Sequence, residues 1–364
     1  MICLKSRLNQ WKNSSFQHLC LDLRSTFEYN QQHLVPSTHI PLEQLHKRMA
    51  ELPPKHIPFA LVTTTIVQNN SFLSTEYKTG EQWLLDRGWQ PRIIFRPNSE
   101  LCFWPKARLA GYVNEKYEQQ QSWIMFSPHP LLKDYMDLIV TTLQQNNNMD
   151  ERRKVLDIGC GSGRDLTWLL LHQRKWCATG VDYLSGARER FETMTTLIKD
   201  RVQFIRAKVQ IDGTWQYLDI MEQHQHNEKK GDGGMMTSFV SNNKNENFNS
   251  YHKDQKTKMM TTRIESEQHH QQQQQYDLVM TFRFFIRPVL WTLPCFVKPG
   301  GILMISHFVD IGDYQQPKKE KRLRKGELND FARRMDLTIL VDRLDTTEDG
   351  NRTMHSMIFQ KRKS

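Results

Sequence analysis

The stretch VLDIGCGSGRD, residues 155–165, decides the fold of this chain. Its apolar beginning is typical of a buried strand that ends near Asp157, and the residues after it are typical of a helix. Between the two lie Gly159, Gly161 and Gly163, which permit a tight turn and let a ligand approach the backbone closely. The first turn of the helix offers free N–H groups and a positive dipole end to a carboxylate. The stretch therefore predicts a strand, a ligand-binding turn and a helix in succession.

The spacing of the glycines distinguishes between nucleotide-containing ligands. They follow the pattern G-x-G-x-G, whereas the dinucleotide fingerprint requires G-x-G-x-x-G, and Arg164 stands where its last glycine would be. This departure argues against NAD or FAD. Asp182 ends the next apolar run, 25 positions after Asp157 (182 − 157), where a carboxylate can accept both hydroxyls of a ribose. The alternative is a purely structural turn.

The motif LDIGCGSGRD resembles the first motif of the class I methyltransferases, which use S-adenosylmethionine as methyl donor. The resemblance implies that the glycine turn holds the amino-acid end of this cofactor and that the acid after the second strand holds its ribose. It also implies an acid that steadies the turn or meets the cofactor's ammonium group through water, and an aromatic side chain against the adenine. In the order of these roles, the implied cofactor-binding residues are Gly159, Gly161 and Gly163, then Asp182, Asp157 and Tyr183.

Two further stretches resemble a tellurite-resistance-like branch of that family. The stretch 125–139 resembles the helix that precedes the first strand of the domain. The stretch 276–308 resembles the fourth and fifth strands and carries the branch's pattern of arginine, aromatic, arginine and proline. These residues are Arg283, Phe284, Arg287 and Pro288. The resemblance thus covers residues 125–364, apart from an insertion.

Short apolar runs separated by helical segments predict an α/β fold, and the resemblance makes it a Rossmann-like seven-stranded methyltransferase sheet. The last two runs are expected to close the sheet as a hairpin. Ligands of such sheets bind beyond the carboxyl ends of the strands, so the methyl acceptor is expected there. The expected strands are 154–159, 178–183, 202–207, 276–282, 301–308, 337–344 and 355–361.

Arg283 and His307 lie at that edge and are the candidate catalytic residues. In one interpretation, Arg283 and Arg287 grip an anionic acceptor, and His307 is a base or a hydrogen-bond donor. In the other, Arg283 pairs with an acid at a helix end and His307 caps the strand. Cys160, inside the turn, is interpreted as a small buried residue. The alternative is a thiol activated by the helix N-terminus.

The N-terminal zone, residues 1–100, has a strand–helix–strand order that predicts a small parallel α/β domain. Its expected helices are 42–52 and 79–88. Its expected strands are 18–23, 59–65 and 91–95. A linker is expected at 101–124, before the methyltransferase domain.

This zone resembles a rhodanese domain in a set of residues spread over its first half. They are Asp22, Arg24, Glu28, His33, Ile40 and Pro41. Active members carry a cysteine after the strand expected at 59–65, but no cysteine occurs between Cys20 and Cys102. Without that thiolate no sulfur can be carried, so the domain is predicted to be catalytically silent and to dock a protein partner. A regulatory anion pocket in the same loop is the alternative.

A low-complexity insertion is expected at 222–275. It is rich in His, Gln, Asn, Lys and Met and has few large apolar residues, so burial cannot offset its ordering entropy and a disordered loop is predicted. The alternative is a metal site made by His224, His226, His269 and His270. No metal site is predicted elsewhere, because none of the six cysteines forms a C-x-x-C pair.

The chain as a whole is basic, with a formal net charge of +10 over 364 residues and a pI near 9.2. Such a charge suits an acidic partner, and the basic run at 318–325 adds to it. No apolar run approaches the roughly 20 residues that cross a bilayer, so no membrane partner is predicted. The scattered cysteines indicate an intracellular, cytoplasmic protein. An acid-free start, faintly like a transit peptide, leaves a mitochondrial location open.

The predicted function is methyl transfer from S-adenosylmethionine to a small-molecule acceptor. The first alternative is a methyltransferase of RNA or tRNA, which the positive charge favours. The second is a non-catalytic binding protein in which both domains have lost their chemistry. The intact glycine turn and Asp182 speak against this second alternative.

Overall fold

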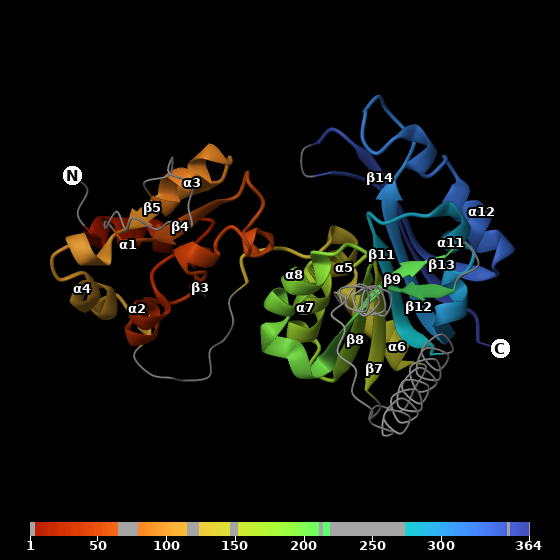
Figure 1. Ribbon diagram of the computed structural model, residues 1–364, viewed down its shortest axis with the longest axis horizontal. Coiled ribbons are helices and arrows are strands. Elements are labelled where there is room, and N and C mark those ends of the chain that lie inside the picture. Colours follow the sequence, from red (N-terminus) through yellow and green to blue (C-terminus); the bar gives the residue numbers. More distant parts are fainter. Residues whose placement is uncertain are drawn as a thin grey trace, which may run out of the picture. The chain divides into compact units, whose positions relative to one another are not determined.

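The structure is a computed structural model and describes residues 4–64, 79–114, 124–145, 152–210, 214–218, 274–347 and 350–363 (Figure 1). These residues belong to two compact units. The first unit comprises residues 1–133, 162–172 and 189–200, and the second unit comprises 134–161, 173–188 and 201–364. The expected insertion at 222–275 lies outside the described residues, except for its last two.

The first unit contains a four-stranded parallel sheet with the strand order β3-β1-β4-β5. These strands are β1 (Cys20–Asp22), β3 (Thr38–His39), β4 (Pro58–Val62) and β5 (Gln90–Phe95). A separate antiparallel pair joins β2 (His33–Leu34) to β6 (Val113–Asn114). The helices between them are α1 (Leu4–Lys12), α2 (Thr26–Gln31), α3 (Gly80–Asp86) and α4 (Phe103–Leu109). The parallel α/β order expected for this zone is confirmed.

Both faces of this sheet are covered by apolar side chains. Alternate residues of one strand point to opposite faces, and neighbours in β4 enter two different clusters, Leu61 one and Ala60 the other. Helix α1 adds Trp11, which is 0% exposed, to the cluster that contains Ala60. The start of the chain is therefore part of a folded core.

Two expectations for the first unit differ from the structure. The helix expected at 42–52 is two short 3-10 helices, η1 (Leu42–Gln44) and η2 (Met49–Glu51). Pro41, before η1, has no side chain that can cap a longer helix, and tertiary packing buries Leu45 and Leu52, each of which directly follows one of the two 3-10 helices. The expected linker at 101–124 contains α4 and β6, and α4 buries its apolar side chains in the cluster around Trp11.

The second unit is built on an eight-stranded sheet with the order β10-β9-β8-β7-β11-β12-β14-β13 (Figure 1). The strands are β7 (Arg153–Ile158), β8 (Trp176–Asp182), β9 (Val202–Val209), β10 (Trp215–Tyr217), β11 (Tyr276–Phe282), β12 (Val297–Phe308), β13 (Leu337–Thr346) and β14 (Thr353–Lys361). Strands β9, β8, β7, β11 and β12 are parallel, and β14 and β13 follow them in the sheet as an antiparallel hairpin. The expected mixed α/β fold and its final hairpin are confirmed.

The expected count of seven strands is wrong, because β10 adds an eighth at the edge. This strand pairs antiparallel with β9 through a short connection, in which the Gln210 N–H donates to the Thr214 carbonyl at 2.8 Å. The ring of Trp215 is buried and lies 5.5 Å from that of Phe296. This contact is distant in sequence, so the three-residue strand has no local signal.

Helices and 3-10 helices connect these strands. They are α5 (Pro130–Asp134), α6 (Met136–Gln144), α7 (Arg164–His172), α8 (Ala187–Met194), η4 (Thr196–Arg201), α11 (Arg287–Leu290), η5 (Leu293–Phe296), η6 (Lys319–Lys321) and α12 (Glu327–Arg334). The helix expected at 125–139 is two helices, α5 and α6, that break at Tyr135. Arg343 stabilises this break, since its guanidinium lies over the Tyr135 ring and pairs with Asp134 at 3.0 Å. No described helix is long and apolar enough to cross a membrane.

The strand order creates a switch point between β7 and β11. From β7 the chain proceeds outward to β8 and β9, and it then returns to the other side of β7 to form β11 and β12. In open α/β sheets, ligands bind beyond the carboxyl ends of the strands at such a point. The turn after β7 and the residues after β11 are therefore the two sides of the expected crevice.

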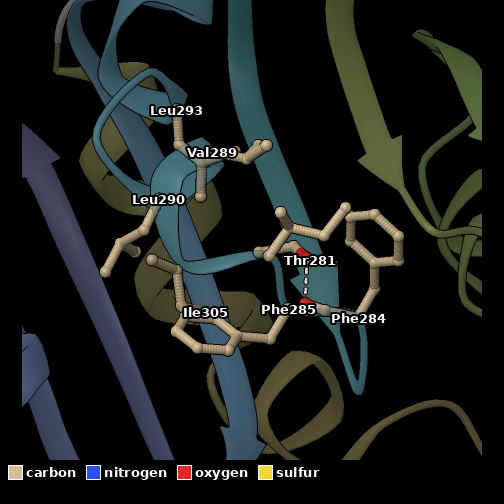
Figure 2. Close-up of a pocket in the computed structure, with 8 residues that line it drawn as sticks. Thr281, Phe284, Phe285, Val289, Leu290, Leu293 and Ile305 are labelled. Atoms are coloured by element: carbon tan, nitrogen blue, oxygen red, sulfur yellow. Dashed lines mark hydrogen bonds between the residues drawn. The ribbon is translucent and has the colours of Figure 1, made fainter. Parts of the chain in front are cut away.

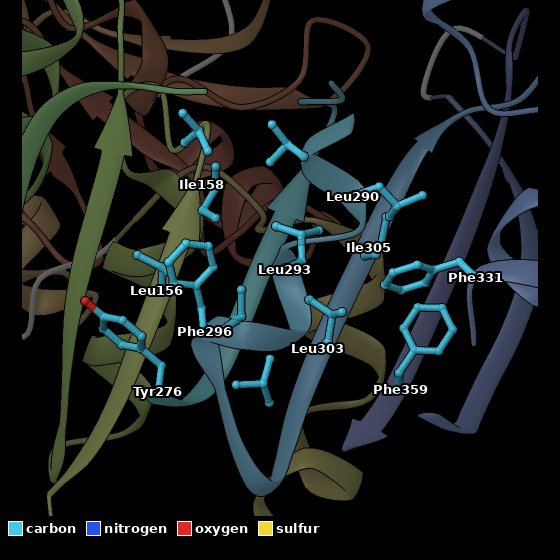
Figure 3. Packing of buried hydrophobic residues seen from close by; sticks show 14 of the residues in the cluster. Leu156, Ile158, Tyr276, Leu290, Leu293, Phe296, Leu303, Ile305, Phe331 and Phe359 are labelled. Atoms are coloured by element: carbon cyan, nitrogen blue, oxygen red, sulfur yellow. The ribbon is translucent and has the colours of Figure 1, made fainter. Parts of the chain in front are cut away.

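The core beside this crevice is formed by one face of the sheet and the elements that pack on it (Figure 3). Leu303 and Ile305 of β12 and Phe359 of β14 meet Leu290 of α11 and Phe331 of α12. All five side chains are at most 2% exposed. Dense packing of this kind fixes the strand ends, and with them the residues that follow β7, β11 and β12.

A buried ion pair in the first unit yields a prediction on stability. The Arg24 guanidinium bonds to the Asp22 carboxylate at 2.6 Å, and the two side chains are 3% and 0% exposed. Arg24→Met keeps the packing but leaves the carboxylate buried and unpaired, so we expect a loss of about 3–5 kcal/mol in the free energy of unfolding. Urea denaturation followed by tryptophan fluorescence measures it. The double variant Asp22→Leu/Arg24→Met should lose less, and an equal loss would contradict the explanation.

Candidate functional site

The glycine turn follows β7 and is fixed by hydrogen bonds to the end of β8. The N–H groups of Gly159 and Cys160 both donate to the Val181 carbonyl, at 2.8 and 3.1 Å. Gly159, Gly161 and Gly163 have φ angles of 80°, 56° and 77°, which side chains rarely tolerate. The path of the backbone therefore strongly favours glycine at these three positions.

Asp182 holds the turn from the neighbouring strand. Its Oδ2 accepts the Gly161 N–H and its Oδ1 accepts the Leu184 N–H, both at 2.9 Å. The residue is only 7% exposed. An ionised carboxylate has about four acceptor sites on its two oxygens, and these bonds use one on each oxygen. Each oxygen thus keeps capacity for one more donor, and a ribose has two hydroxyls to offer.

The turn is open over one glycine and closed over the other two. A Cβ at Gly161 would meet no heavy atom within 4 Å. A Cβ at Gly159 would lie 2.3 Å from the Cβ of Phe284, which follows β11. A Cβ at Gly163 would lie 2.7 Å from the ring of Phe191 in α8. Free space for a ligand therefore exists above Gly161.

The remaining predicted cofactor residues flank the turn. Asp157 is buried in β7, one residue before its end, and is 3% exposed. Tyr183 follows Asp182 directly and is 49% exposed, so its ring is accessible. Burial, and then the charges of Asp157 and Asp182, raise the pKa of the Cys160 thiol well above its ordinary value. Cys160 is half-buried, and the direction of this pKa shift argues against an activated thiol.

Arg283 lies directly after β11 in a strained backbone conformation. Its φ is 58°, an uncommon value for a residue with a side chain, and its N–H donates to the Ser306 carbonyl at 2.8 Å. The side chain is exposed and has no partner among the described residues. Its guanidinium is therefore accessible at the edge where ligands of this sheet bind.

The guanidinium of Arg287, unlike that of Arg283, is held by several partners. Its guanidinium pairs with the Glu327 carboxylate at 2.7 Å and also donates to the carbonyls of Glu320 and Arg322, at 2.9 and 2.6 Å. The interpretation that Arg287 grips an acceptor is therefore replaced by a structural role. The partner of this arginine is the segment after β12.

His307 is buried near the end of β12 and is 4% exposed. Its Nε2 lies 3.0 Å from the carbonyl of Lys321, which can only accept, so Nε2 carries the proton. The ring stacks on Phe285 at 5.1 Å, and Nδ1 is buried without a partner. Burial, opposed by this hydrogen bond, lowers the pKa of His307 from 6.5 to about 4. His307 is therefore neutral at pH 7 and a weak base.

A small apolar pocket lies between β11, α11 and β12 (Figure 2). Its one hydroxyl, Thr281 Oγ1, donates to the Phe284 carbonyl at 2.9 Å, so the lining offers an incoming ligand little polar contact. Phe284 belongs to this lining and also contacts Gly159, so it lies between the pocket and the turn. The lining residues are Thr281, Phe284, Phe285, Ile286, Val289, Leu290, Leu293 and Ile305.

The sequence marks Phe284 as part of the branch pattern and places it just after an expected strand, but it does not distinguish Phe285. In the structure, Phe284 packs against Gly159 of the turn and Phe285 stacks on His307, and these contacts depend on the folded path of the segment after β11. A run of aromatic residues after a strand is a weak signal for such a site, because the same pattern fills ordinary cores.

No protein-family profile matches the chain. An uncharacterized protein of Schizosaccharomyces pombe is 27% identical over 354 residues, which cover 94% of this chain and 93% of that protein. Among solved structures, an O-methyltransferase family protein from Burkholderia thailandensis is similar with a TM-score of 0.34 and 14% identity, over 64% of this chain and 58% of that one.

A second similar structure is the 1,6-didemethyltoxoflavin-N1-methyltransferase of Burkholderia thailandensis, with bound 1,6-didemethyltoxoflavin and S-adenosylhomocysteine. Its TM-score is 0.36 and its identity 12%, over 64% of this chain and 79% of that one. These scores are low, and the function proposed below rests on the geometry of the turn.

The pKa of His307 predicts that acid destabilises the second unit. The group binds a proton less readily when folded, so stability is full above about pH 6.5 and is lost as the pH falls toward 4. We expect a loss of about 2–3 kcal/mol between pH 7 and pH 4.5 that is absent in His307→Gln. Urea titrations at several pH values measure it. His46→Gln, at an exposed position, is the control, and an equal pH dependence in His307→Gln would disprove the assignment.

The two glycines at the start of the turn predict different losses of stability on substitution by alanine. Gly161→Ala should cost only the backbone strain, about 1–2 kcal/mol, as should Gly350→Ala, where φ is 71° and no atom lies within 4 Å. Gly159→Ala should cost clearly more, because its Cβ would overlap Phe284. Thermal unfolding of the three variants compares them. Similar melting temperatures for Gly159→Ala and Gly161→Ala would argue against the described position of Phe284.

Proposed function

We propose that this protein is an S-adenosylmethionine-dependent methyltransferase that acts on a small-molecule acceptor. One observation carries the proposal: at the switch point of the sheet, Asp182 is bonded to a glycine turn and keeps an acceptor site on each oxygen, beside open space over Gly161. Arg164 stands where the last glycine of the dinucleotide fingerprint would be, which argues against a dinucleotide in the same place.

The residues at the turn fit this cofactor in detail. The backbone at Gly161 is open to a ligand, as the amino-acid end requires, whereas Phe284 covers Gly159 and Phe191 covers Gly163. The free acceptor sites of Asp182 match the ribose hydroxyls. Within the proposal, Asp157 steadies the turn and the accessible ring of Tyr183 lies against the adenine.

In the proposed mechanism the protein aligns the reactants and excludes water. The cofactor supplies an electrophilic methyl group when bound. Phe284, which contacts both Gly159 and the apolar pocket, limits the acceptor to a small apolar group on that side. Arg283 is proposed to contact a negative charge on the acceptor, because its guanidinium is exposed and its backbone is fixed by Ser306.

His307 is proposed as a positioning residue rather than as a base. Its Nε2–H is committed to the Lys321 carbonyl, and a pKa of about 4 makes proton abstraction by Nδ1 unfavourable. The residue thereby fixes the segment after β12. An acceptor that is already a good nucleophile needs no strong base.

Two family relationships, to a branch of the methyltransferases and to the rhodanese domains, are also proposed. The residues at 283–288 support the tellurite-resistance-like branch for residues 125–364. The parallel sheet β3-β1-β4-β5 and the buried pair of Asp22 and Arg24 support a rhodanese-like domain for residues 1–100. Because no cysteine lies between Cys20 and Cys102, this domain is proposed to be silent and to serve as a docking module.

Calorimetric titration with S-adenosylhomocysteine tests the proposed cofactor. The wild-type chain should bind it, and Asp182→Ala should weaken binding about 10- to 100-fold, because two hydrogen bonds to a charged group are lost. Gly161→Ala should weaken binding as well, since its methyl group enters the open space above the turn. NAD, titrated in the same way, should not bind.

Asp137→Asn, at an exposed carboxylate on α6, is the control and should bind like the wild type. No heat of binding in the wild type, or equal affinity in Asp182→Ala, would refute the cofactor site. Transfer of a labelled methyl group to a mixture of small metabolites distinguishes the enzyme from the non-catalytic alternative, because only the enzyme should label a metabolite. The nucleic-acid alternative rests on a different feature, the charged segment after β12.

A further inference from the structure

A basic strap, residues 317–326, follows β12 at the ligand-binding edge of the sheet. It contains six basic residues and one acid, Glu320. Its Leu323 is tied to the end of β12, since the Leu323 N–H donates to the Phe308 carbonyl and the Asp310 N–H donates to the Leu323 carbonyl, both at 2.8 Å. The strap therefore lies beside the end of the strand that also carries His307.

Side chains beneath the strap hold its backbone at three consecutive residues. The carbonyls of Glu320 and Arg322 accept from Arg287, and the carbonyl of Lys321 accepts from His307. Arg322 is itself buried, 6% exposed, and donates to the Pro317 carbonyl at 2.8 Å. Because the backbone of the strap is anchored, the Cα atoms of its basic residues are fixed in place. Less conformational entropy is therefore lost when these residues bind a ligand.

Two acids near the strap, Asp310 and Glu327, are engaged by cations. The Asp310 carboxylate pairs with Arg322 at 3.2 Å and with Lys319 at 3.4 Å. The Glu327 carboxylate pairs with Arg287 and accepts the Arg324 N–H at 2.8 Å. Four exposed cations of the strap are left without an ion-pair partner among the described residues. They are Lys318, Lys321, Arg324 and Lys325.

We propose that the basic strap is a binding surface for the phosphate backbone of a single-stranded nucleic acid. Exposed cations spread over eight residues suit a chain of charges rather than one ion, which would require convergent and desolvated donors. The strap's one large apolar side chain, Leu323, is 0% exposed, so it offers nothing to insert into a lipid surface. The inference goes beyond the proposed function, because the strap and the glycine turn are separate features.

The test is fluorescence anisotropy with a labelled 20-nucleotide oligouridylate and the full chain at several KCl concentrations. Four phosphate contacts predict that affinity falls about 50-fold between 50 and 200 mM salt, from a slope of about 0.7 per contact. Lys318→Glu/Lys325→Glu removes two contacts, so it should weaken binding at least about 10-fold at 50 mM and reduce the salt dependence to about 7-fold. Both positions are exposed, so the variant should fold.

Lys133→Glu/Lys199→Glu is the matched control, with the same change of net charge at exposed lysines outside the strap. It should keep most of the affinity. An equal loss in this control, or no binding by the wild type at 50 mM salt, would overturn the proposal. So would displacement of the RNA by pyrophosphate at constant ionic strength, or strap-dependent binding to phosphatidylserine vesicles without binding to RNA.

Titration of the same samples with S-adenosylhomocysteine separates this proposal from the proposed function. The strap variant should bind S-adenosylhomocysteine like the wild type, because the turn is unchanged. A wild-type chain that binds RNA but not S-adenosylhomocysteine would refute the methyltransferase and leave the strap assignment standing. The reverse result would refute only the strap assignment.

Discussion

The hydrogen bond from the Gly161 N–H to the Asp182 carboxylate is the constraint on which the candidate site depends. It ties the turn after β7 to the end of β8, and the same carboxylate takes the Leu184 N–H at the start of the next connection. One buried charge thus fixes the ends of two strands at the switch point. A ligand hydroxyl that met this carboxylate would bind a group already held in place, and little further ordering would oppose the binding.

The parts of the fold that the sequence predicted correctly are those with local causes. Apolar runs located the strands β7, β8, β9, β11 and β12, and glycines with left-handed φ angles located the turn. The strand β10 was missed because the burial of Trp215 depends on Phe296, which is remote in sequence. The helix expected at 42–52 failed for a related reason, since the buried apolar residues of this stretch, Leu45 and Leu52, each follow a separate 3-10 helix.

The proposed cofactor half and the proposed acceptor half of the site also differ in how much of each the sequence predicts. The proposed cofactor half lies on one continuous motif plus Asp182, so spacing alone could name its residues. The proposed acceptor half depends on partners that spacing cannot reveal: Arg287 is paired with Glu327, whereas the side chain of Arg283, four residues earlier, has no partner within the part of the chain that the structure describes. Position alone left His307 open as a base, a hydrogen-bond donor or a cap of the strand, whereas its burial and its hydrogen bond to the Lys321 carbonyl make it neutral at pH 7. Protonation state follows from environment, which the sequence does not display.

The apolar pocket and the basic strap, in their proposed roles, would constrain different parts of one acceptor. Methyl transfer, the proposed reaction, engages only the nucleophilic atom and its neighbours, so Phe284 and the pocket would limit the size of the reacting group alone. Phosphate contacts position a ligand and take no part in the reaction. Phe285 links the two features physically, because it lines the pocket and stacks on His307, which holds the strap. An acceptor with a small reactive end and a phosphate-bearing remainder would satisfy both features, and its length would decide how many cations of the strap it engages.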